Sequence, residues 1–221
     1  MRYIQKVETP QFFKNNSIGV STWNEYKASK KPLREYILKH EQNDLCVYCE
    51  SQVTSSNSSS HIEHIRPKAQ DKYPELTFEY TNLTVSCNGN CHIVDDNVNH
   101  NCEHRKDKVD TPFCETKFLN PVELKNIRDY FKYDIDEGTI LASSKNELKA
   151  NYMIDTLELN SSNSGLKKAR KIALEVFRDD FKKLKDIRQK KELIIRELNK
   201  EERPFISFLR YRFRRLLNQN T

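Results

Sequence analysis

The sequence predicts an α+β fold in which a small cysteine-rich core lies between helical segments. Five of the six cysteines fall within residues 45–110. Apolar residues recur at helical spacing in 21–43 and across 145–221, and a short stretch of the core around Ile62 and Ile65 alternates like a strand. We therefore divide the chain into an N-terminal helical segment (1–44), a core (45–110) and a mostly helical C-terminal region (111–221) that is basic from residue 166.

The N-terminal segment is expected to contain one interrupted helix. Residues 1–20 are mixed in character, with Pro10 and Gly19 as breakers, and are expected to be extended or loop. Apolar residues at helical spacing predict a helix over 21–43, interrupted at Pro32.

The C-terminal region is expected to begin with irregular structure and a short hairpin. Alternating residues predict strands at 130–134 and 139–141. Residues 145–221 have a helical pattern, with breaks expected at 160–165 and near Pro204.

The composition argues against a membrane-spanning or secreted protein. No run of 18 apolar residues is present, and the first residues contain no apolar stretch suited to a signal peptide, so a cytoplasmic location is expected. Cysteines in a reducing cytosol favour metal binding over disulfides. The net charge of +6 is uneven, because residues 166–221 are strongly basic and the rest of the chain is slightly acidic.

The cysteine spacing predicts one tetrahedral zinc site. Cys46 and Cys49 form a Cys-x2-Cys knuckle, and a second cluster follows near Cys87. Four thiolates complete a structural zinc site. The expected ligands are Cys46, Cys49, Cys87 and either Cys102 or Cys91. Cys114 is expected to be an ordinary small buried residue.

Between the cysteine clusters lies a second set of polar residues. Glu63 and His64 belong to a short alternating segment, and Asn82 precedes an apolar run that leads into the second cluster. A single histidine in a strand is more often structural than catalytic. An acid followed directly by histidine, with an asparagine before a cysteine cluster, is much less often accidental, so we interpret these three residues as a candidate active site.

These residues resemble the HNH (ββα-metal) nuclease family, whose motif is an acid–His pair, a central Asn and a final metal-binding residue. In that family, two antiparallel strands and a helix hold a divalent cation. Over nearly its full length the chain is also similar to a narrower branch, the PtuB-like HNH proteins of Septu antiviral systems and some retron defence cassettes. The matching strings are Glu41-Gln42, residues 45–50, 61–68, 86–89, 102–106 and 157–160.

The resemblance implies a metal-dependent endonuclease acting on DNA. His64 is expected to be the general base, because imidazole titrates near neutral pH. Asn82 is expected to orient that imidazole, and Glu63 to bind the catalytic divalent cation, Mg²⁺ being suited to oxygen ligands. Three nearby cations are expected either to contact phosphates or to be surface charges: Arg66, Lys68 and Lys106.

The third element of the motif is open. The family commonly ends in Cys-His-x-x-Lys, whereas this chain has Cys102 and Lys106 with Glu103 in the histidine position. Cys91-His92 keeps the Cys-His pair but lacks the lysine. Glu103, His104 and His92 therefore compete for this position, with Glu103 and His104 expected to help bind the catalytic cation.

The resemblance also implies partners: DNA and a PtuA-like ATPase, in a complex that can be oligomeric. The alternative is a non-catalytic, zinc-binding module of degenerate HNH fold that binds DNA or a protein.

Residues 166–221 are expected to be helical and to serve binding, or simply to be a solvated helical cover. Their apolar seam is Phe177, Phe181 and Leu184, and their basic–aromatic face is Arg210, Arg212, Arg214 and Arg215 among Phe208, Tyr211 and Phe213.

Overall fold

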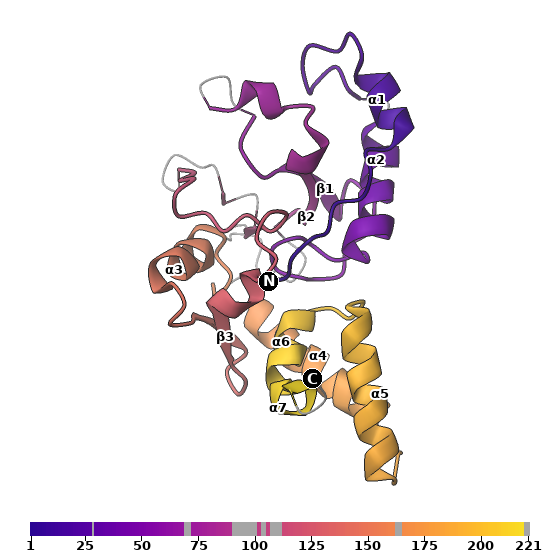
Figure 1. Ribbon diagram of the computed structural model, residues 1–221, viewed down its shortest axis with the longest axis vertical. Helices are drawn as coiled ribbons and strands as arrows, with labels where there is room; N and C mark the ends of the chain where they lie inside the picture. The colour runs from indigo at the N-terminus through magenta and orange to yellow at the C-terminus, as the bar shows by residue number, and fades with distance from the viewer. Residues whose placement is uncertain are drawn as a thin grey trace.

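The computed structural model describes residues 1–27, 29–68, 72–89, 101–102, 105–106, 112–161 and 165–218. In these residues the helices are α1 (Gln11–Ser17), α2 (Lys30–Ile37), α3 (Glu147–Thr156), α4 (Leu166–Asp180), α5 (Ile187–Lys200), α6 (Ile206–Arg212) and α7 (Arg214–Leu217). The strands are β1 (Ser60–His64), β2 (Leu83–Cys87), β3 (Phe131–Asp134) and β4 (Thr139–Ala142), which form two separate antiparallel pairs. The predicted α+β class is confirmed. Figure 1 shows α1, α2, β1 and β2 at one end of the molecule and α4–α7 at the other.

The N-terminal segment differs from its prediction at two points. Helix α1 lies within residues 1–20, which we expected to be loop, and Pro10 occupies the position just before its first turn. Helix α2 begins only at Lys30, so the prediction of a helix from residue 21 is wrong. Pro32 lies in the first turn of α2, where its missing N–H would have had no partner within the helix. The proline therefore fits the first turn of this helix and does not interrupt it.

The hairpin β1–β2 is fixed on both sides. His64 pairs with Leu83 in the antiparallel register, and every residue of β2 is buried. On the other edge of β2, the side chain of Gln42 donates to the carbonyl of Val85 (2.9 Å) and accepts from its N–H (2.7 Å). Gln42 ends the π-helical turn Leu38–Gln42 that follows α2, so this turn substitutes for a third strand.

The C-terminal region agrees with its prediction except for a break between α4 and α5, which was not expected. Strands β3 and β4 form the expected hairpin, and the expected breaks near residues 160–165 and Pro204 separate α3 from α4 and α5 from α6. Gly138 in the hairpin turn has φ +69°, and a Cβ there would collide with the carbonyl of Lys167 at the start of α4. Only glycine allows the turn to approach this helix so closely.

A buried carboxylate joins the core to the C-terminal helices. Glu50 accepts hydrogen bonds from the backbone N–H (2.8 Å) and the hydroxyl (2.6 Å) of Ser207, in the first turn of α6. The amino group of Met1 lies 3.3 Å from the same carboxylate. Burial raises the pKa of Glu50, but the Met1 amino group and Ser207 more than offset this and hold that pKa below its ordinary value. Glu50 is therefore an anion that caps α6.

Candidate metal centre and active site

Four buried cysteines form a cluster that could hold a metal ion: Cys46, Cys49, Cys87 and Cys102. Their sulfur atoms all lie within 4.8 Å of one another. The Sγ atoms of Cys46 and Cys102 are 4.0 Å apart, and those of Cys49 and Cys87 are 3.8 Å apart. Zn–S bonds of about 2.3 Å in a tetrahedron place the sulfurs about 3.8 Å apart. The spacing of the thiols thus fits a tetrahedral ion.

Local backbone geometry delivers these thiols from three separate segments. Cys87 ends β2, and its N–H donates to the Sγ of Cys46 at 3.3 Å. The N–H of Cys102 donates to the carbonyl of Leu157 (2.9 Å), which anchors it to the end of α3. Burial raises the pKa of the Cys102 thiol, so a thiolate at this position requires a nearby cation. A metal ion bound by the four thiols would supply that cation.

The sequence left the fourth thiol open, and the structure brings Cys102 to the cluster. Cys91, the competing candidate, lies outside the described residues. Cys114 stands apart from the cluster, with its Sγ 3.4 Å from the hydroxyl of Thr116. It is only partly buried, so the expectation of a buried core residue is wrong.

His64 is held at the end of β1 as a neutral imidazole. Its Nε2 lies 3.0 Å from the carbonyl of Thr77, and its ring packs edge-on against Trp23 with centroids 4.6 Å apart. Since a carbonyl only accepts, Nε2 carries the proton and Nδ1 is left to accept one. Burial, with the nearby charge of Lys68, lowers the pKa of His64 to about 3. The ring is therefore unprotonated at neutral pH and able to accept a proton, although a pKa so far below 7 makes it a weak base in this state.

Asn82 makes no hydrogen bond to the His64 ring, contrary to the expectation that it orients the imidazole directly. Its Oδ1 accepts from the N–H of Arg66 (2.8 Å), and its Nδ2 donates to the carbonyls of Arg66 (2.9 Å) and Leu76 (3.3 Å). Leu76 precedes Thr77, whose carbonyl holds the ring. Asn82 thus acts one residue away, by tying the chain after β1 to the segment that positions His64.

Glu63 lies in a buried ion pair. Its Oε1 accepts from the hydroxyl of Tyr48 (2.6 Å) and lies 2.8 Å from the Nζ of Lys106. The same ammonium donates to the carbonyls of His64 (2.8 Å) and Ile65 (2.9 Å). Lys106 is fully buried, so the expectation that it is a phosphate contact or a surface charge is wrong.

This ion pair bears directly on the expected catalytic cation. The ammonium of Lys106 and the hydroxyl of Tyr48 both bind Oε1 of Glu63, and the positive charge of Lys106 would repel a divalent ion at this carboxylate. Within the described part of the chain, the cysteine cluster is the only group of possible metal ligands. Glu103, His104 and His92 lie outside the described residues. The described residues therefore do not by themselves fit a divalent ion at Glu63.

Two other cations flank the site. The guanidinium of Arg66 is bound by the carboxylates of Glu115 and Glu123, each at 2.7 Å, and the hydrogen bond to Glu123 is the main cause that raises the pKa of Arg66. Arg66 is thus already paired with acids. Lys68 is exposed, and its charge acts on His64, so it remains a candidate for phosphate contact beside the imidazole.

Some residues of the site carry no signal in the sequence. Thr77 acts through its backbone carbonyl, which any residue type provides. The partnership of Lys106 with Glu63 joins residues far apart in the chain and follows no periodicity. Tyr48 lies between the knuckle cysteines and faces Glu63, and only its position inside the motif could have drawn attention to it.

We expect Lys106→Met to lower the free energy of unfolding by about 3–5 kcal/mol, because it leaves the Glu63 carboxylate buried without its charged partner. The double variant Glu63→Gln/Lys106→Met should recover much of this loss. Urea denaturation of zinc-loaded protein measures both. Lys68→Met, an exposed lysine, is the matched control and should change stability by less than about 0.5 kcal/mol. A Lys106→Met variant as stable as the wild type would contradict the pairing.

No protein-family model matches the chain, and the curated proteins give no significant match. In the described residues, every helix is too short or too polar to cross a bilayer. A functional interpretation therefore depends on the motifs and on the geometry of the site.

Proposed function

We propose that the protein is an HNH-type endonuclease that hydrolyses phosphodiester bonds of DNA, with zinc in the four-cysteine cluster as a structural ion. The observation that carries this proposal is His64 at the end of an antiparallel hairpin, neutral and held by the Thr77 carbonyl, while Asn82 ties the hairpin together. The cysteine cluster lies at the opposite end of the same hairpin, because Cys87 pairs with Ser60 there.

In this proposal His64 takes a proton from the attacking water through Nδ1. Hydrogen bonding of Nε2 to Thr77 keeps the ring in the tautomer that leaves Nδ1 free of a proton. The cation of Lys68 is placed to attract the scissile phosphate, since an anionic substrate needs nearby positive charge. The resemblance implies a catalytic divalent ion, Mg²⁺, with Glu103 or His104 among its ligands; Glu63 would join them only if Lys106 left its carboxylate.

On the same resemblance we propose that the protein is a PtuB-like nuclease of antiviral defence and that a PtuA-like ATPase is the partner that restrains or directs it. Nuclease effectors harm their host if they act without control, so a restraining partner is consistent with this class.

A second candidate is a non-catalytic zinc-binding module of the same fold. Two observations favour it: the Glu63 carboxylate is occupied by Lys106, and His64 is only 4% exposed. Such a module would bind DNA or a protein without cutting. It has no use for a neutral imidazole held in one tautomer, which is why we prefer the enzyme.

The test is incubation of zinc-loaded protein with supercoiled plasmid, with Mg²⁺, Mn²⁺ or no added divalent ion, and with or without the ATPase. We expect nicked or linear product only when a divalent ion is present. A labelled single-stranded RNA in a parallel arm tests the substrate class. Retained DNA binding without cleavage in any arm would replace the nuclease with the binding module.

A further inference from the structure

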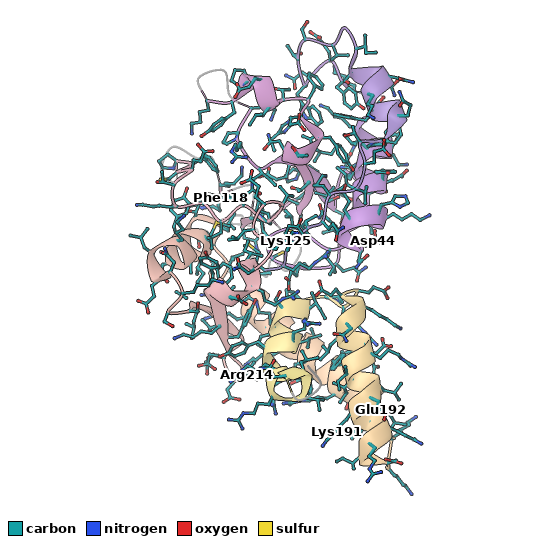
Figure 2. All side chains as sticks on the ribbon, in the orientation of Figure 1. Asp44, Phe118, Lys125, Lys191, Glu192 and Arg214 are labelled. Carbon is teal, nitrogen blue, oxygen red and sulfur yellow. The ribbon has the colours of Figure 1, made fainter. Side chains whose placement is uncertain are left out.

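A hollow of about 670 Å³ lies between β3 and the helices α6 and α7, away from the candidate active site. Its charged lining residues are Lys125, Arg128, Lys132, Arg210 and Arg214, with Asp129 as the single acid. Lys125 and Arg214 are labelled in Figure 2. The carboxylate of Asp129 is already bound by Lys145 at 2.9 Å. The hollow is therefore strongly basic.

The positive charges in this hollow are only partly neutralised. Glu201 accepts from Arg128 at 3.0 Å and lies 3.9 Å from Arg210, so one carboxylate serves two guanidiniums. Burial and then the charge of Arg128 lower the pKa of Arg210, consistent with crowding of like charges. An anion entering the hollow would relieve this repulsion.

The guanidiniums are also held in place before any ligand binds. Arg128 donates to the hydroxyl of Ser207 (3.2 Å), and Arg210 donates to the carbonyl of Leu198 (2.9 Å). Arg214 donates to the carbonyl of Tyr211 (2.7 Å) and stacks on its ring, 4.1 Å from the centroid. Groups that are ordered in advance lose less conformational entropy on binding.

We propose that this hollow binds the phosphodiester backbone of a nucleic acid. Planar guanidiniums bind phosphate oxygens in pairs. The exposed guanidinium of Arg214, stacked on the ring of Tyr211, also offers a flat surface on which a base can stack. An acidic peptide could use the charge but has no base to stack on this surface. The proposal rests on the proposed function and deepens it by naming where the substrate is held.

The hollow also divides the basic tail into two classes. Arg210 and Arg214 line it together with lysines from the middle of the chain, whereas Arg212 and Arg215 are exposed on the same helices outside it. The sequence grouped all four as one face. The structure thus supplies a matched pair of variants that remove the same charge from neighbouring positions.

The test compares Lys132→Gln/Arg214→Gln with Arg212→Gln/Arg215→Gln, in full-length zinc-loaded protein, by fluorescence anisotropy with a labelled duplex. We expect Lys132→Gln/Arg214→Gln to lower the affinity for the duplex by about tenfold or more. The slope of log affinity against log salt concentration should become shallower by about 2, because each lost phosphate contact contributes about 0.9. The control should keep both. Equal losses in the two variants, or none in the hollow variant, would overturn the proposal. Circular dichroism and zinc content exclude misfolding.

Two further arms separate this proposal from the proposed function. If the wild type cleaves plasmid and the Lys132→Gln/Arg214→Gln variant binds DNA as the wild type does, the hollow does not bind DNA but the proposed nuclease activity is supported. If the Lys132→Gln/Arg214→Gln variant loses DNA binding and the wild type does not cleave, DNA binding in the hollow is supported and the proposed nuclease activity is contradicted. Poly-glutamate that competes as strongly as DNA of equal charge would overturn the nucleic-acid assignment in favour of an acidic protein partner.

Discussion

Cys87→Ser is expected to release zinc and to unfold much of the core. The four thiols come from three segments that meet at the cluster, so a bound ion links β2 to the knuckle and to the end of α3. The apparent binding energy of a structural zinc site is about 10–16 kcal/mol, which exceeds the stability of most small domains. The charged composition of this chain limits the apolar core that could compensate.

Elemental analysis after dialysis without added metal should give one zinc per chain for the wild type and none for Cys87→Ser or Cys46→Ser. Cys114→Ser is the matched control, because this thiol lies outside the cluster, and it should keep zinc and helicity. Cys102→Ser should also lose zinc. If Cys102→Ser keeps zinc while Cys91→Ser loses it, the assignment of the fourth ligand is wrong.

His64→Ala is expected to lower plasmid cleavage by about 100- to 10,000-fold, the contribution typical of a positioned general base. The neutral ring, held through Nε2, is the proton acceptor that the proposed hydrolysis needs. Cleavage is measured as the rate of loss of supercoiled DNA under the most active metal and partner conditions. Duplex binding should stay close to wild type, since His64 acts on the chemical step.

His61→Ala provides the matched control on the same strand. His61 bonds Asn88 and faces the other side of β1, so its loss should leave the cleavage rate near wild type. Because His64 packs on Trp23, alanine could loosen the fold, and His64→Gln is the second variant that preserves volume. Wild-type cleavage by either His64 variant, with zinc retained, would remove this residue as the base.

Local patterns predicted a good part of this molecule. Alternation identified the β3–β4 hairpin and strand β1, and the helical period identified the C-terminal helices. The break between α4 and α5 was missed, because apolar residues near Phe181 and Leu184 continue the helical period across it. At the N-terminus, proline was read only as a breaker, although a first-turn position tolerates it.

By itself the sequence determined the chemistry that is available: cysteine spacing for a metal site, an acid–histidine pair, and a basic tail. These features are short sequence motifs, and their residue spacing is enough to predict the local geometry of a strand or a metal-binding knuckle. The tertiary structure decided which of these groups meet. Cys102 joins the cysteine cluster, Glu63 forms an ion pair with Lys106, and the imidazole of His64 donates to the backbone carbonyl of Thr77. These contacts join segments that are far apart in the sequence. They form because buried polar groups need hydrogen-bond or charge partners, and this requirement produces no periodic pattern in the sequence.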